Sequence, residues 1–367
     1  MPAETSSRAR VNAPFFLSHL LLLSCSEMPE DSPTPEVPIE RISLTSNFQV
    51  GGLALLHADG TVSAAQTVLH GDAVAREAFG LLYVVNRLGG DNIQVLDPAA
   101  DFATIQQLSV GAGSNPQDIA VVSSQQAFVA AYNRSALLEV DLSTGALLRE
   151  LDLSSFAADD PDGYPELSSV LLVEDRLVVA LQRLERTSSG YIPLGDSYLV
   201  QLDVQSGQVL RSLRLAYANP VGLLKAGTDG LLRVPLSGRF GVVGDGGVEL
   251  IEPRALTSLG VLVDEQTLQG DVLAVTGAQP LYVVTGQDSV GMDARTALLR
   301  WDGDGIETLL QSNGWHLWDV EADANGVVWC TDRNLKAPGV WKLSPEDSTP
   351  VFTAFGAEVL PPTWWSG

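Results

Sequence analysis

The sequence predicts an all-β fold built from repeated antiparallel units, and three observations carry this prediction. The chain has 34 glycines and 20 prolines, and its valines and leucines stand in short runs, a pattern typical of many strands and turns. The stretch "FVAAYNRSALLEVDLSTGALLRELDL" at 128–153 has a cruder copy, "LYVVNRLGGDNIQVLD", at 82–97. In both copies an apolar strand runs into Asn-Arg, crosses a polar turn and alternates through a second strand to Asp. Such copying indicates a repeat architecture.

Strand pairs of two kinds alternate along the chain from about residue 45 onward. The first kind is an apolar pair, predicted at 72–86, 118–133, 166–182, 220–236, 271–285 and 317–331. The second kind is a hairpin of alternating strands around a turn with Asp, Ser, Thr or Gly, predicted at 52–69, 92–110, 136–153, 197–215, 247–263, 297–311 and 339–354. One apolar pair and the hairpin after it make a four-stranded antiparallel blade.

We therefore expect residues 41–367 to form a single β-propeller, because a closed ring of blades leaves no long sheet edge exposed. Seven blades are favoured. The first hairpin has no apolar pair before it, so residues 41–69 would join the C-terminal "AFGAEVLPPTWWSG" in a composite seventh blade. A six-bladed ring with an N-terminal hairpin lying on its side is the alternative.

The first 40 residues have the composition of an export signal followed by a tether. Arg8 and Arg10 precede "APFFLSHLLLLSC", an apolar run too short for a stable membrane-spanning helix but right for a signal peptide over residues 1–24. The prolines and acidic residues of "SEMPEDSPTPEVPIE" then favour an extended, disordered tether over residues 25–40.

The end of the signal, Leu22-Leu23-Ser24-Cys25, resembles the lipobox of bacterial lipoproteins. The resemblance implies that Cys25 becomes the lipidated first residue of the mature chain. Because Ser26 is not the Asp that tends to mean inner-membrane retention in such lipoproteins, it also implies anchoring at the outer membrane, on either its periplasmic or its surface face. An ordinary signal peptide that contains a cysteine is the alternative. With Cys25 lipidated, Cys330 has no disulfide partner and is expected to be a buried, inert thiol.

Two of the repeats resemble the YVTN-type β-propeller family. The resemblance lies in Tyr83-Val84-Val85-Asn86 with Ile93-Gln94-Val95-Leu96-Asp97, in Ala131-Tyr132-Asn133 with Leu138-Glu139-Val140-Asp141, and in Gly113-Ser114-Asn115-Pro116. In later blades it weakens to Tyr198-Leu199-Val200-Gln201-Leu202-Asp203 and Tyr282-Val283-Val284-Thr285. It implies a fold and hardly a function. We interpret the repeated Asn and Asp as turn and packing residues.

Composition and motifs exclude several classes of function. The chain carries 21 basic and 45 acidic residues, which argues against a nucleic-acid or anionic-membrane surface. Beyond the signal, His57, His70 and His316 are far apart and lack zinc-site spacing. The glycine-rich "GVVGDGGVE" at 241–249 lies between alternating strands and is interpreted as a hairpin connection. No cofactor is required by any motif. The tryptophans of the C-terminal third either fill the wedge between blades or form the floor of a pocket.

An acidic loop, "AADDPDGYPE" at 157–166, is the one candidate metal site. It gathers Asp159, Asp160, Asp162 and Glu166 around a Pro-Asp-Gly turn. Clustered carboxylates are what a hard cation needs, so calcium is the metal predicted for Asp160, Asp162 and Glu166, although the EF-hand spacing is missing. A solvated loop without an ion is the alternative.

A second polar pattern pairs acids with arginines. In four blades an acid opens the first strand and an arginine follows the second: Asp72 with Arg87, Asp118 with Arg134, Glu166 with Arg183, and Asp319 with Arg333. Because the two strands are antiparallel, these ends meet on one face of the ring. The pattern predicts a belt of ion pairs, within a blade or between neighbours. The alternative is a ring of arginines aimed at an anionic ligand in the central funnel.

No catalytic motif emerges, so the sequence favours a lipid-anchored extracytoplasmic propeller that acts as a binding or scaffold protein. Its ligand, a protein or a small molecule, is not indicated. A hydrolase or lyase with its site in the central funnel is one alternative. A component of a cell-envelope assembly is the other.

Overall fold

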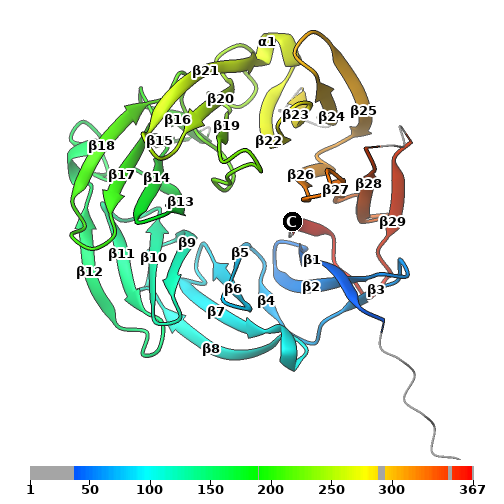
Figure 1. Ribbon diagram of the computed structural model, residues 1–367, viewed down its shortest axis with the longest axis horizontal. Helices are drawn as coiled ribbons and strands as arrows, with labels where there is room; N and C mark the ends of the chain where they lie inside the picture. The colour runs from blue at the N-terminus through cyan, green and yellow to red at the C-terminus, as the bar shows by residue number, and fades with distance from the viewer. Residues whose placement is uncertain (1–36, 189, 288–293, 346–348, 366–367) are drawn as a thin grey trace, which may run out of the picture. The chain divides into compact units, whose positions relative to one another are not determined.

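The computed structural model describes residues 37–188, 190–287, 294–345 and 349–365, and these form a ring of seven antiparallel sheets, a β-propeller (Figure 1). The seven-bladed prediction is confirmed, and the six-bladed alternative is wrong. The predicted signal peptide, Cys25 and the tether up to residue 36 lie outside the described residues. Within the described part of the chain, no helix has the length and apolar character needed to cross a membrane.

Blades 1 to 6 follow one another along the chain, and blade 7 combines both ends of it. Their strands, from the ring centre outward, are as follows: in blade 1 β5 (Ala73–Ala78), β6 (Leu81–Asn86), β7 (Asn92–Asp97) and β8 (Ala103–Ser109); in blade 2 β9 (Pro116–Ser123), β10 (Gln126–Ala131), β11 (Ala136–Asp141) and β12 (Leu147–Asp152); in blade 3 β13 (Leu167–Val173), β14 (Arg176–Leu181), β17 (Tyr198–Asp203) and β18 (Val209–Arg214); in blade 4 β19 (Leu232–Leu236), β20 (Gly247–Glu252) and β21 (Thr257–Asp264); in blade 5 β22 (Asp271–Gly277), β23 (Leu281–Gln287), β24 (Arg295–Trp301) and β25 (Ile306–Asn313); and in blade 6 β26 (Leu317–Ala322), β27 (Val328–Asp332), β28 (Gly339–Leu343) and β29 (Val351–Ala354). A small hairpin, β15 (Leu184–Thr187) and β16 (Gly190–Pro193), is inserted in blade 3, and α1 (Glu265–Leu268) precedes blade 5.

Blade 7 closes the ring in the composite way predicted. Its inner strand, β30 (Pro362–Trp365), comes from the C-terminal end and pairs with β1 (Ile39–Ser46), which pairs in turn with β2 (Val50–His57). The short β3 (Val62–Ala64) and β4 (Leu69–His70) both pair with β2. Hydrogen bonds between the two ends of the chain therefore join the first blade to the last.

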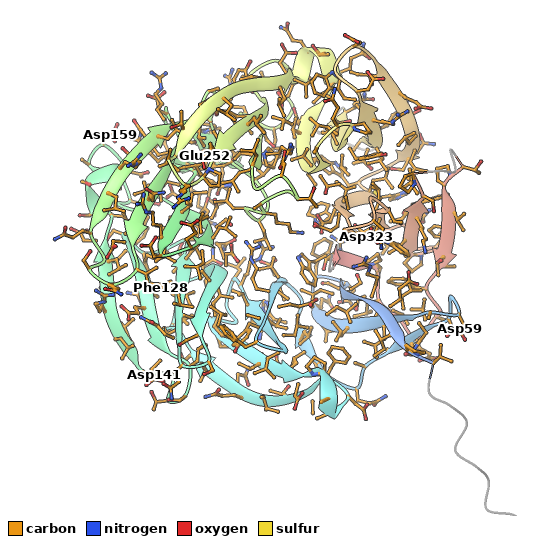
Figure 2. The ribbon with its side chains drawn as sticks, viewed as in Figure 1. Asp59, Phe128, Asp141, Asp159, Glu252 and Asp323 are labelled. Atoms are coloured by element: carbon orange, nitrogen blue, oxygen red, sulfur yellow. The ribbon has the colours of Figure 1, made fainter. Side chains whose placement is uncertain are left out.

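The core lies between the blades. The middle strands are covered on both faces, so they are apolar almost throughout rather than alternating. Between blades 2 and 3, for example, Phe128 and Leu137 pack against Leu177, Val179 and Val200, all of them 0% exposed. Figure 2 shows Phe128 inside the ring wall.

The repeated Asp is a turn residue, as interpreted from the sequence. The Asp141 carboxylate, at the outer edge of the ring in Figure 2, accepts hydrogen bonds from the backbone N–H of Ser143 at 2.7 Å and of Thr144 at 3.2 Å. Asp203 does the same for the N–H of Ser206 at 2.7 Å. Each carboxylate satisfies donors that the tight turn would leave exposed.

Blade 4 departs from the predicted pattern at its inner edge. The apolar pair expected at 220–236 contributes only β19, and the segment before it joins β19 through isolated bridges, Pro220 to Leu236 and Ala226 to Leu232. Gly222 has a φ of 70°, in the left-handed region that glycine adopts at no steric cost. The unlabelled loop beside β19 in Figure 1 consequently projects into the centre of the ring.

Candidate functional site

The centre of the ring holds a cavity of about 1120 Å³. Ligand pockets usually enclose about 300–1,000 Å³, so this space admits a small organic molecule. Every blade contributes to its walls, through Val74, Gln117, Ser168, Val221, Leu273, Trp318 and Trp364.

One face of the ring, which we call the rim, carries exposed aromatic side chains around the cavity. The inner strands begin at this face, and the loops after the second strands return to it, because the first two strands of a blade are antiparallel. Phe48, Tyr191, Phe240 and Trp318 come from four different blades, and they are 72%, 50%, 50% and 39% exposed. Aromatic rings of this kind offer flat apolar surface to a ligand.

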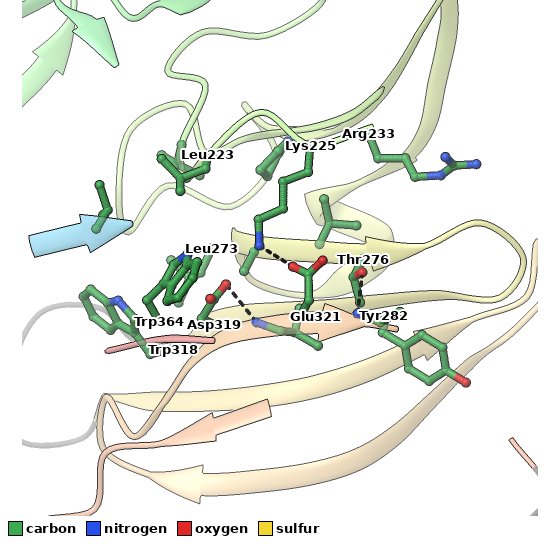
Figure 3. Close-up of a pocket in the computed structure, with 18 of the residues that line it drawn as sticks. Leu223, Lys225, Arg233, Leu273, Thr276, Tyr282, Trp318, Asp319, Glu321 and Trp364 are labelled. Atoms are coloured by element: carbon green, nitrogen blue, oxygen red, sulfur yellow. Dashed lines mark hydrogen bonds and ion pairs between the residues drawn. The ribbon is translucent and has the colours of Figure 1, made fainter. Parts of the chain in front are cut away.

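The irregular segment of blade 4, residues 220–228, crosses the centre and ties distant blades together. The N–H of Leu224 donates to Ser169 Oγ of blade 3 at 2.8 Å, and its carbonyl accepts from Arg76 of blade 1 at 3.0 Å. Lys225 forms an ion pair with Glu321 of blade 6, as Figure 3 shows. This segment therefore acts as a strut across the cavity.

Asp118 is a buried carboxylate that bonds to two residues which hold the strut, Arg76 and Ser169. Its carboxylate is 0% exposed and accepts hydrogen bonds from Arg76 Nε at 2.9 Å and Nη2 at 2.7 Å, from Ser169 Oγ at 2.6 Å, and from the N–H of Val170 at 2.9 Å. Burial alone would lower the pKa of Arg76, but the charge of Asp118 outweighs it and holds that pKa above its ordinary value. The pair therefore stays ionised and joins blades 1, 2 and 3.

The structure brings together one of the four predicted acid–arginine couples. Arg87 forms an ion pair with Asp72. Asp118 pairs with Arg76 instead of Arg134, because it stands within β9 opposite Ala130, four residues before Arg134. The pairing expected for Arg134 is therefore wrong.

The pairing of Glu166 with Arg183 is wrong as well. Arg183 pairs with Asp159, and Glu166 turns inward to accept the N–H of Leu184 at 2.8 Å. Both Glu166 and Arg183 have left-handed backbone conformations, with φ of 47° and 56°, which a regular strand pair does not have.

Asp319 and Arg333 form no ion pair among the described residues. Asp319 accepts the N–H of Val320 at 3.0 Å, whereas Arg333 lies between the rings of Phe48 and Trp318. The register of β26 and β27 shifts between Leu317 and Val320, where Asp319 stands. Of the four arginines of the predicted belt, Arg87 and Arg183 thus have a carboxylate partner, whereas Arg134 and Arg333 have none among the described residues.

The acidic loop does bring its three carboxylates together. Asp160, Asp162 and Glu166 each offer one oxygen, and these atoms lie within 4.8 Å of one another. Burial raises the pKa of Glu166 to about 8, and the charges of Asp160 and Asp162 add to this shift. Burial also raises the pKa of Asp160. The donor set, carboxylate oxygen only, suits a hard cation.

A second pair of buried acids supports the rim from below. Glu265 accepts the N–H of Val272 at 3.0 Å and of Gly244 at 3.2 Å, and Asp271 accepts the N–H of Gly241 at 2.6 Å. Burial raises the pKa of Glu265 to about 7 and also raises that of Asp271. These contacts hold the hairpin connection that carries Phe240.

Sequence reasoning missed Arg76, Ser169, Lys225 and Glu321, since nothing near them in the sequence marks their partners. The irregular strut did have a sequence signal: "ANPVGLLKAGTDG" at 218–230 is rich in glycine, which disfavours a regular strand.

Both interpretations of the tryptophans hold, because Trp329 is 2% exposed in the core whereas Trp318 lines the cavity. Cys330 is buried as expected, and burial raises its pKa well above the ordinary value.

Comparison with known proteins supports the fold alone. No family model and no curated protein matches the sequence, so the YVTN resemblance stays a prediction. A candidate 6-phosphogluconolactonase from Bacteroides uniformis is similar in structure, with a TM-score of 0.61, 11% identity, and coverage of 90% of this chain and 99% of that one. Streptogramin B lyase gives a TM-score of 0.53 and 13% identity over 81% of this chain and 92% of its own.

A third similar structure is hydrazine synthase of Kuenenia stuttgartiensis, with a TM-score of 0.54 and 12% identity over 71% of this chain and 73% of that one. In all, 1014 solved chains match, and such breadth makes the likeness a statement about architecture. The chain is a seven-bladed β-propeller. At these identities, the activities named for the similar proteins belong to those proteins.

Proposed function

We propose that this propeller is an exported, lipid-anchored binding protein that holds a small molecule in its central cavity. The observation that carries the proposal is the cavity of about 1120 Å³ with aromatic rings from four blades at its rim. Ligand sites combine apolar walls with a few polar groups, and Gln117, Gln182 and Asn219 supply such groups here.

The cavity gives less support to a hydrolase or lyase. Glu321, one of the acids that line the cavity, is neutralised by Lys225 (Figure 3). Burial raises the pKa of Tyr132, which keeps its hydroxyl protonated, and the Cys330 thiol is likewise buried and protonated. A lowered pKa would activate a nucleophile, whereas the pKa of both groups is raised.

Export and anchoring form the second part of the proposal. They rest on the apolar signal and on Cys25, which resembles a lipidated cysteine and lies outside the described residues. Attachment at the outer membrane would keep the propeller on a tether outside the cytoplasm, free to meet small solutes. No separate observation favours the alternative that the protein is a component of a cell-envelope assembly.

A calcium ion at the acidic loop is the third part. Calcium takes six to eight oxygen ligands, and Asp160, Asp162 and Glu166 would supply the carboxylates. Because burial raises the pKa of Glu166 to about 8, the ion would have to displace a proton. Binding should therefore strengthen as the pH rises toward 8.

The test is a binding screen on the full chain in detergent. Thermal shift against a library of small organic molecules should find ligands, and Phe240→Ala should weaken them about tenfold or more. Phe79→Ala is the matched control, since Phe79 is 62% exposed but does not line the cavity. A library that yields no ligand, or ligands indifferent to Phe240→Ala, would contradict binding in the cavity.

A further inference from the structure

Arg333 is a buried arginine at the cavity rim whose charge no carboxylate neutralises among the residues that the structure describes. It is 7% exposed. Its Nη2 reaches only the carbonyl oxygen of Ser46, at 3.4 Å, and its Nε has no hydrogen-bond partner. Arg87 and Arg183, which follow the second strand of their own blades, each have a carboxylate partner. Arg134, at the same position in blade 2, also has no carboxylate partner among the described residues, but it is half-buried, whereas Arg333 is buried.

Two aromatic rings enclose the Arg333 guanidinium. Its central carbon lies 4.1 Å from the centre of the Phe48 ring and 5.2 Å from that of Trp318. Rings stabilise a guanidinium through its flat faces, but they accept none of the hydrogen bonds that its edge offers. A buried cation with unused donors is costly unless a partner arrives. Burial lowers the pKa of Arg333 to about 10, so the charge persists at neutral pH.

Two acids that line the same cavity make other contacts. Asp72 is paired with Arg87, and the Asp319 carboxylate accepts the N–H of Val320. Leu273 and Trp364 line the cavity beside Trp318 and give this part of the wall an apolar surface, although Asp319 and the Lys225–Glu321 pair also line the cavity (Figure 3). A guanidinium fork binds carboxylate and phosphate oxygens through two parallel hydrogen bonds, which matches the donors left free here.

We propose that the ligand of the central cavity is a small organic oxyanion, whose carboxylate or phosphate group binds Arg333 while its apolar part lies against Trp318 and Leu273. This inference rests on the proposed function, because it names the class of molecule that the cavity takes. The formal net charge of −24 belongs to the whole chain, and salt screens the exposed charges that lie more than about 8 Å from the ligand at physiological ionic strength.

The experiment uses matched pairs of probes on the full chain in detergent. Aromatic and aliphatic carboxylic acids, and phosphate monoesters, are each compared with the neutral amide or alcohol of the same shape by isothermal titration calorimetry at pH 7. We expect the acids or phosphates to bind at least tenfold more tightly than their neutral partners. Arg333→Gln should abolish this preference and leave the neutral probes unchanged, and which anionic series binds identifies the oxyanion.

The control is Arg254→Gln, which removes an arginine that is 70% exposed and outside the cavity, and it should keep the preference. If Arg333→Gln does not fold, Arg333→Lys keeps the charge without the fork, and it should still weaken acid binding severalfold. Neutral probes that bind as tightly as acids, or acid binding unchanged in the Arg333 variants, would overturn the inference while the binding function stands. No binding in either series would overturn both.

Discussion

We expect Asp118→Asn to lower the stability of the propeller strongly, although it changes the size of the side chain very little. The amide has almost the shape of the carboxylate, so packing is kept while the charge is removed. What is lost is the ion pair with Arg76, in which Asp118 is 0% and Arg76 17% exposed, and an acceptor for Ser169 or Val170. Arg76 would be left as a buried cation without its counterion.

The magnitude follows from the geometry. Breaking a buried ion pair by removing one partner costs about 3–5 kcal/mol. The entropy of unfolding is about 2.1 cal/mol/K per residue, which gives roughly 0.7 kcal/mol/K for a unit as long as Val37–Gly367. The melting temperature should therefore fall by about 4–7 °C.

Differential scanning calorimetry of the two proteins measures this fall directly. Asp175→Asn is the matched control, since Asp175 is 78% exposed and its nearest contact with Arg176 is 3.7 Å long. An exposed pair is worth at most about 1 kcal/mol, so the control should lose about 1.5 °C or less. If Asp118→Asn loses no more than the control, the Asp118 carboxylate does not hold blades 1 to 3 together.

Three further outcomes are expected. Cys25→Ala should release the protein from membranes, because the acyl chains supply the attachment; fractionation after a high-salt wash that still pellets the variant would contradict this. Calcium should raise the melting temperature and chelator lower it, and Asp162→Asn should end the difference; equal curves for the natural protein would exclude the ion. Because the folded pKa of Glu265 is raised from 4.5 to about 7, its contribution to stability is complete below pH 4.5 and lost as the pH rises through 7. Glu265→Gln should flatten that decline in urea titrations between pH 5 and 8, and an unchanged slope would refute the assignment.

The strands and their order could be predicted from the sequence because each depends on residues close together in the chain. The apolar pair expected at 72–86 appears as β5 and β6, and the hairpin expected at 339–354 appears as β28 and β29 with the same limits. Apolar runs, turn residues and the copied unit are local signals. The closure of the ring could also be predicted. The N-terminal hairpin has no apolar pair before it, so its blade must be completed by a strand from the C-terminal end of the chain.

The partners of the charged side chains were decided only by the tertiary structure. Asp118 meets Arg76 and Ser169, and Lys225 meets Glu321, because closing the ring places neighbouring inner strands and the strut of blade 4 around one centre. Register shifts such as the one at Asp319, and left-handed residues such as Glu166, also depart from the regular strand geometry on which the predicted pairs depended. The sequence determined that arginines would stand at one face. Which of them keeps an unneutralised charge depends on contacts between segments as distant as Phe48 and Arg333.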